Sequence, residues 1–176
     1  GLILSLTSAR HTIHFPGTRT SVSVAEVFTF FAAITLGPYH AALLAAFDMV
    51  LVCQRRQVRP AMYVFNPANV ALSTFVAGVL FAKVKVVLQS RPLVAASGQE
   101  VLTFALPLIA LAVTYYLLHI SIVALMLRLL KGTPIRETVQ GAFLLESATS
   151  VAAASVAGAL TFTVSNFSLL ASVVAL

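Results

Sequence analysis

The chain has 176 residues, of which 60% are hydrophobic and only 9% are charged, and its formal net charge is +6. Soluble domains carry about 25% charged residues, so this composition excludes a soluble globular domain of ordinary surface. The basic residues lie between apolar runs and not in a stripe interleaved with aromatic side chains. We therefore expect a lipid bilayer as the partner and no nucleic acid.

The first elements precede a helical bundle. Residues 1–10 read as the end of a truncated membrane helix, and residues 11–22 as an extended cytoplasmic segment with a turn at Pro16-Gly17. Ser23 and Glu26 form a capping box at the start of the next helix. We expect residues 23–176 to form the bundle and residues 1–176 to be a single integral membrane domain.

The apolar stretch over residues 25–54 contains Gly37-Pro38, where we expect a helix break. Either one kinked span or two short helices, at about 25–36 and 38–54, would fit. Two helices place eight of the eleven basic residues on one side and three on the other, whereas one span splits them six to five. The positive-inside tendency favours two helices, with this larger basic group in the cytoplasm: Arg10, Arg19, Arg55, Arg56, Arg59, Arg128, Lys131 and Arg136.

Four further apolar runs follow, at residues 61–84, 101–131, 141–160 and 162–176. The run from Val101 to Lys131 is the clearest membrane span, because 26 residues without Asp, Glu, Lys or Arg make a helix of about 39 Å. Asn66 is expected to cap a helix that begins at Pro67. The predicted fold is an all-α, polytopic membrane bundle of about six or seven helical segments, whose last segment returns to the cytoplasmic side.

Polar side chains inside membrane helices are costly and mark candidate sites. Four such residues are candidates for contact with a ligand or a proton, although helix–helix hydrogen bonding or ion pairing would explain each of them too: Asp48, Asn69, His119 and Glu146. A second group could bind lipid head groups or a partner, although a basic cytoplasmic loop is the simpler interpretation: Arg55, Arg56 and Arg59.

Motifs for catalysis are missing from the sequence. It has no Gly-rich phosphate loop, no nucleophile elbow and no paired His-Glu zinc motif. The single cysteine, Cys53, excludes an internal disulfide and a cysteine-based zinc site, and the pair His11 and His14 has no nearby carboxylate. We expect a protein that is not an enzyme, with no metal and no cofactor.

Three stretches carry a resemblance to a known group of proteins: residues 15–48, 65–81 and 115–139. Their order and spacing resemble the N-terminal multi-pass membrane module of bacterial signalling proteins with an HD-domain phosphohydrolase or a diguanylate cyclase as output. The resemblance covers about residues 12–160. It implies a sensor or anchor module in the bacterial cytoplasmic (inner) membrane that passes a signal to a cytoplasmic effector. This chain contains no effector domain, so no residue here is assigned the output chemistry.

Two other functions fit the sequence. An accessory subunit of a larger membrane complex, such as one with pigments or redox centres, would co-purify with other membrane chains at fixed stoichiometry. A small-molecule transport component would need a cavity near the middle of the membrane and an energising partner.

Overall fold

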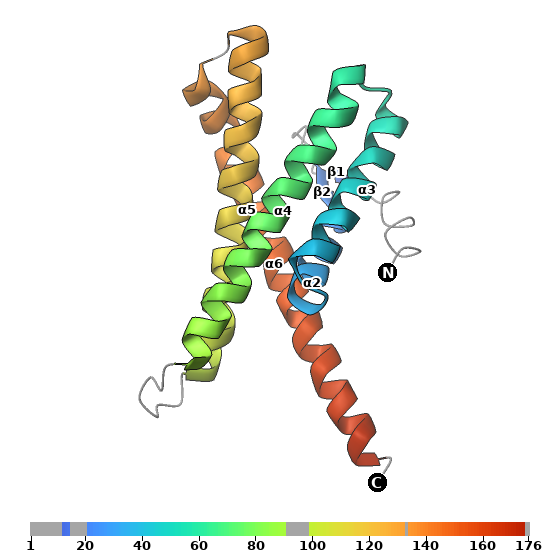
Figure 1. Ribbon diagram of the computed structural model, residues 1–176, viewed down its shortest axis with the longest axis vertical. Coiled ribbons are helices and arrows are strands. Elements are labelled where there is room, and N and C mark those ends of the chain that lie inside the picture. The colour runs from blue at the N-terminus through green and yellow to red at the C-terminus, as the bar shows by residue number, and fades with distance from the viewer. Residues whose placement is uncertain (1–11, 15–20, 91–98, 133, 175–176) are drawn as a thin grey trace.

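The computed structural model describes residues 12–14, 21–90, 99–132 and 134–174, with side chains given for residues 25–90, 103–132, 134–136, 139–140 and 147–164. Within these ranges the chain forms two short strands and five helices (Figure 1). The strands β1 (Thr12–His14) and β2 (Ser21–Ser23) pair antiparallel and lead directly into the first helix.

Helices α2 (Val24–Thr35) and α3 (Pro38–Arg56) are separated at Gly37, so the structure has two short helices and not one kinked span. Gly37 has φ 92°, a left-handed conformation that glycine adopts without strain, and Pro38 occupies the first position of α3. The two helices run in opposite directions and pack against each other (Figure 1). Local chemistry at this turn therefore makes a helical hairpin.

The prediction that a helix begins at Pro67 is wrong, because helix α4 spans Pro60–Ser90. The helix begins at Pro60 and continues through Pro67, whose side chain is buried in the bundle. Asn66 is not a cap, because its side chain donates a hydrogen bond to the Cys53 thiol at 3.7 Å. Proline inside a membrane helix is tolerated where neighbouring groups satisfy the freed backbone, and the apolar residues before Pro67 extend the helix by more than a turn.

Helix α5 (Gln99–Lys131) ends as expected, with Gly132 at φ 69°. The prediction of two separate helical segments after α5 is wrong, because α6 (Ile135–Val174) is one continuous helix. It runs without a break through residues 160–162. Residues 135–174 contain no proline that could remove a backbone donor, and Thr161 and Thr163 bond back to the carbonyls of their own helix. The prediction of six or seven segments is therefore wrong for the described part of the chain, which has five helices.

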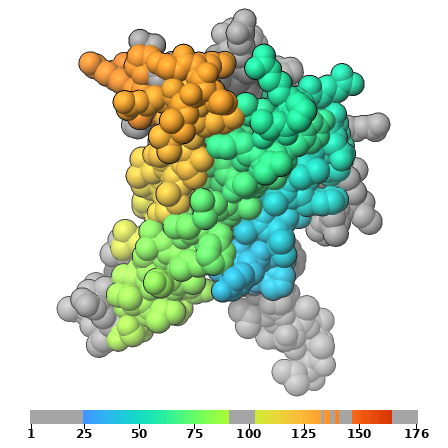
Figure 2. Space-filling model, turned by 45° about the horizontal axis from the view of Figure 1, so that its top comes forward, coloured from blue at the N-terminus to red at the C-terminus, as the bar shows by residue number. Residues whose placement is uncertain are grey.

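The helices pack as successive antiparallel hairpins (Figure 1). Helix α4 lies between α3 and α5, and α6 packs against both α5 and α2. Figure 2 shows α3 and α4 forming one continuous face. Within the described residues, three helices are long and apolar enough to cross a membrane: Pro60–Ser90, Thr103–Lys131 and Ser147–Val164.

Small residues allow these helices to approach closely. The core contains many alanines around a few large side chains, with Phe30 and Leu111 fully buried. Gly78 on α4 lies against the turn between α2 and α3, where an added Cβ would be 3.0 Å from the Pro38 Cβ. Close packing by small residues is the usual way in which membrane helices associate, since lipid gives no hydrophobic drive between them.

The two ends of the bundle differ in charge. The turn between α3 and α4 and the turn between α5 and α6 lie at the same end of the bundle (Figure 1). Both turns and the helix ends beside them carry exposed basic side chains. We call this group the basic end: Arg55, Arg56, Arg59, Arg128, Lys131 and Arg136. The C-terminal part of α6 lies at the opposite end, so the expectation that the last segment returns to the basic side is wrong.

Candidate functional site: a polar layer inside the bundle

A hydrogen-bonded contact joins α4 to α5 within the apolar bundle. The Asn69 amide nitrogen lies 3.2 Å from His119 Nδ1, and the Ser73 hydroxyl donates to Asn69 Oδ1 at 3.4 Å. Asn69 and Ser73 are buried, one turn apart on the same face of α4. Fifty residues separate Asn69 from His119, so the tertiary fold brings together two of the residues that the sequence singles out.

The direction of these bonds defines the state of the imidazole. Asn69 Oδ1 accepts from Ser73, so the Asn69 amide group turns its N–H toward His119. An amide nitrogen donates only, so this contact corresponds to the tautomer of His119 whose Nδ1 carries no proton. Ser73 therefore donates to Asn69, and Asn69 in turn donates to His119.

Aromatic side chains fix the orientation of the histidine ring. Tyr115, one turn earlier on α5, stacks on His119 with ring centroids 5.8 Å apart and an interplanar angle of 8°. Phe30 of α2 meets Tyr115 edge to face at 5.0 Å. Edge-to-face and offset stacking are the favourable arrangements for aromatic pairs, so this contact connects α2 with the polar contact between α4 and α5.

Asp48 lies at the level of Asn69 on the neighbouring helix. Cys53 of α3 contacts α4 between Met62 and Asn66, through bonds of 3.8 and 3.7 Å. Asp48 precedes Cys53 by five residues on α3. Because α3 and α4 are antiparallel, the residues of α4 at the level of Asp48 lie five positions after residues 62–66, at residues 67–71. Asp48 is buried too, on a side of α3 turned by about 140° from Cys53. We call Asp48, Asn69, Ser73 and His119 the polar layer.

Helix α6 passes the same level. Gly158 of α6 faces Leu108 of α5, and His119 lies eleven residues after Leu108. Because α5 and α6 are antiparallel, the residue of α6 at the level of His119 lies eleven positions before Gly158, at Ser147. Glu146 is adjacent to Ser147 along the backbone, and its side chain lies outside the described part of the chain.

A second carboxylate, which the sequence did not single out as a site, lies close to this level. Ser150 donates to Glu26 Oε1 at 3.4 Å, which connects α6 to α2 across 124 residues. The sequence indicates only a helix cap at Glu26, because a capping box explains this residue without a tertiary partner. Ser73 and Tyr115 also had no local signal, since serine and tyrosine are common in membrane helices.

The polar layer lies about half a bilayer thickness from the basic end of the bundle. Asn69 is nine residues from the start of α4 and His119 is twelve residues from the end of α5, which is about 14 and 18 Å from the basic end. Half of the bilayer hydrocarbon is about 15 Å thick. Such groups face the bundle interior because an unsatisfied polar group in lipid is expensive.

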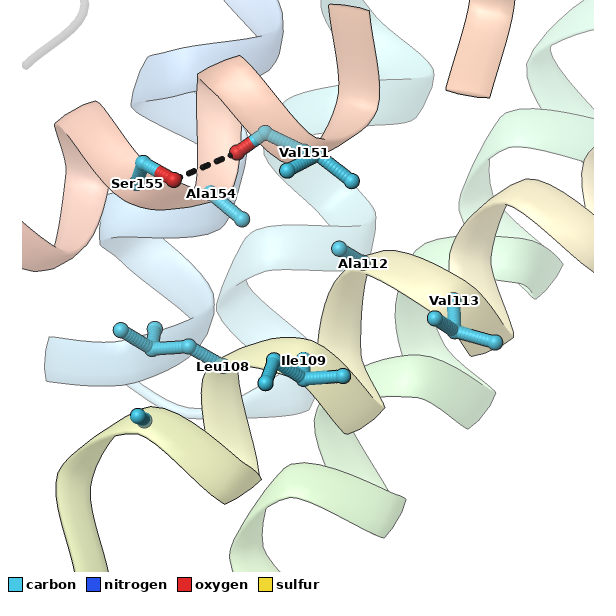
Figure 3. A pocket seen from close by; sticks show the side chains of 8 residues that line it. Leu108, Ile109, Ala112, Val113, Val151, Ala154 and Ser155 are labelled. Carbon is cyan, nitrogen blue, oxygen red and sulfur yellow. Dashed lines mark hydrogen bonds between the residues drawn. The ribbon is translucent and has the colours of Figure 1, made fainter. Parts of the chain in front are cut away.

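A pocket of about 160 Å³ lies elsewhere, between α5 and α6 (Figure 3). Its lining is apolar, and the Ser155 hydroxyl bonds to the Val151 carbonyl of its own helix at 2.8 Å. None of the sequence-predicted site residues lines it. Among the residues that the structure describes, no three His, Cys, Asp or Glu side chains come together as a metal site.

The other predicted group, Arg55, Arg56 and Arg59, lies exposed at the end of α3 and in the following turn, apart from the polar layer. His40 is exposed too, and its Nδ1 lies 2.9 Å from the Leu36 carbonyl oxygen. These side chains are therefore positioned for the membrane surface and not for the site inside the bundle.

Comparison with known proteins gives one match. The family model MASE9 covers residues 3–174, and no match was found among curated proteins or solved structures. The match spans nearly all of the chain, and the three apolar helices agree with a membrane protein. This chain belongs to the MASE9 family, a family of membrane-associated sensor domains.

Proposed function

We propose that this chain is a non-enzymatic sensor module of the bacterial cytoplasmic membrane that passes a signal to a cytoplasmic effector. The observation that carries the proposal is the contact between Asn69 and His119, because it places exchangeable hydrogen bonds between two membrane-spanning helices. A signal that changes this contact changes the relative stability of two helix packings, which is what a sensor requires. Membership of a family of membrane-associated sensor domains supports the same function.

The orientation follows from charge. The basic end carries six exposed Lys and Arg side chains, whereas Lys83 and Lys85 are the two that the described residues place toward the other end. Lys and Arg are enriched in cytoplasmic loops, so the basic end faces the cytoplasm and is the part nearest to an effector. A change in the packing of α4 against α5 would reach this end through the turns that follow α3 and α5.

Labelling with a membrane-impermeant thiol reagent tests the orientation. Gln57→Cys lies in the exposed turn of the basic end and Ser90→Cys lies exposed at the far end of α4, while Cys53 is 1% exposed and does not compete. We expect Ser90→Cys to react in intact cells and Gln57→Cys to react only after permeabilisation. The reverse pattern would exclude a cytoplasmic basic end.

Spin labels at Gln57→Cys and Lys131→Cys test the sensing. Both sites are exposed at the basic end, on the turns of two different hairpins. The distance between them is compared in the intact protein under conditions that turn its cellular output on and off. We expect two distance populations whose ratio follows the output, with a shift of about 1–2 Å, the size of helix movements at packed interfaces. A single unchanged distance would refute a sensor that works by helix packing.

A further inference from the structure

We propose that the polar layer is a proton-binding site, in which His119 takes up the proton and the contact between α4 and α5 must then rearrange. This inference rests on the proposed function, since it names the signal that the sensor binds. The starting point is the donor chain from Ser73 through Asn69 to His119, in which Nδ1 of the imidazole accepts.

Proton uptake reverses the role of Nδ1. A hydronium ion transfers its proton to the Nδ1 lone pair, a new N–H bond forms, water leaves, and the ring becomes an imidazolium ion with two donors. The N–H groups of Asn69 and His119 then face each other across 3.2 Å. Rotation of the Asn69 amide restores the bond only if the Ser73 hydroxyl changes from donor to acceptor. The protonated and neutral states therefore differ in the hydrogen bonds that the Asn69 amide and the Ser73 hydroxyl make between α4 and α5.

The charged side chains that the structure describes at or near this level are the carboxylates of Asp48 and Glu26, and the described hydrogen-bond partner of His119 is Asn69 and neither of them. Helix α3 contributes Asp48, the described part of α4 at this level contributes only the neutral Asn69 and Ser73, and α5 contributes the hydroxyls of Tyr115 and Tyr116. On the remaining helices Glu26 of α2 bonds to Ser150 of α6. The Lys and Arg side chains of the described helices lie toward the two ends of the bundle.

The tight contacts of His119 favour a proton over a larger ligand. Its ring touches Asn69 on one side and stacks on Tyr115 on the other, and Tyr115 in turn packs on Phe30. A molecular ligand that takes the place of Asn69 at Nδ1 would have to break this contact between α4 and α5. A proton adds no volume and acts through the direction of one hydrogen bond, so it fits the site as it stands.

Nitrogen NMR of the whole protein in nanodiscs, with ¹⁵N-labelled histidine, tests the binding step without any substitution of the site. At about pH 8 we expect His119 Nδ1 to be unprotonated, and at about pH 5 to carry a proton. The exposed His40 of α3 gives a second histidine resonance for comparison. His119→Gln assigns the resonance. If His119 keeps one protonation state over this whole range in the folded protein, the proton-binding site is refuted.

Spin labels at Gln57→Cys and Lys131→Cys test the coupling in the same nanodiscs. We expect the wild-type distance to change by about 1–2 Å between about pH 8 and about pH 5. His119→Gln keeps an acceptor for the Asn69 amide and should abolish the change. Asn69→Leu should leave the titration of His119 in place and still abolish the distance change. An equal pH response in His119→Gln would overturn the inference.

The two proposals fail in different ways. A distance that follows the cellular output but does not respond to pH would refute the proton as the signal and leave the sensor function standing. A distance that never changes, under any condition that alters the output, would refute the proposed function itself.

Discussion

Replacing Gly78 by alanine should destabilise the protein, because the added methyl group meets atoms that cannot move aside. Its Cβ would lie 3.0 Å from Pro38 Cβ and 3.2 Å from Pro38 Cα, whereas carbon atoms pack best at about 3.5–4.0 Å. Pro38 has a closed ring, no free rotamer, and a backbone held at the turn between α2 and α3. Helix α4 or this turn must shift as a whole.

The magnitude follows from two opposing terms. Overpacking of a well-packed core costs about 1–3 kcal/mol, and alanine gains about 0.8–1.0 kcal/mol over glycine in a helix. The expected net loss for Gly78→Ala is therefore about 1 kcal/mol, with an upper value of about 2 kcal/mol. Reversible unfolding by a denaturing detergent, followed by circular dichroism in mixed micelles, measures this difference.

Gly158→Ala is the matched control, since its overlap is numerically worse and yet should cost less. The new Cβ would lie 2.6 Å from Leu108 Cδ1, which is the end of a flexible side chain. Leu108 lines the pocket of about 160 Å³ between α5 and α6, so it can rotate into open space (Figure 3). We expect no loss, or a gain of up to about 1 kcal/mol. A larger loss for Gly158→Ala than for Gly78→Ala would refute this reasoning.

Two further predictions concern neighbouring groups and use the same unfolding assay. Ser73→Ala should lower the free energy of unfolding by about 1 kcal/mol, because it removes the hydrogen bond to Asn69. Thr74→Val should leave the free energy of unfolding unchanged or raise it by about 1 kcal/mol, because no described residue bonds the buried Thr74 hydroxyl oxygen. Equal losses for the two variants would contradict this. Phe30→Leu should lose about 0.5–1.5 kcal/mol of aromatic pairing with Tyr115 in addition to any packing change, and this extra loss should vanish when Tyr115 is already replaced by leucine. A double-mutant cycle without coupling would show that the ring pair contributes nothing.

The membrane class of the protein is evident from the sequence, because it depends on composition and not on contacts. The break at Gly37-Pro38 and the end of α5 at Gly132 could also be predicted from the sequence, since each depends on the backbone conformation of one or two residues. The prediction of two last segments failed for the opposite reason. Glycine and small residues only weaken a helix, and α6 continues because lipid penalises every unbonded backbone group.

The sequence identified Asp48, Asn69 and His119 as costly polar groups, but it gave no reason to pair Asn69 with His119. An apolar membrane helix has lipid on one side and other helices on the rest, so no hydrophobic stripe marks its buried face. Rotation and register of α3, α4 and α5 decide which side chains meet. Ser73 and the Tyr115 ring joined the site for the same reason.

The amino-acid sequence by itself determined that this chain lies in a membrane, where its helices turn at Gly37, and which helix ends carry positive charge. Only the tertiary structure decided that Asn69 meets His119 and that Glu26 meets Ser150. Composition and turn chemistry act over a few residues, whereas these pairs depend on the packing angles and offsets of whole helices, to which small residues along the entire interface contribute.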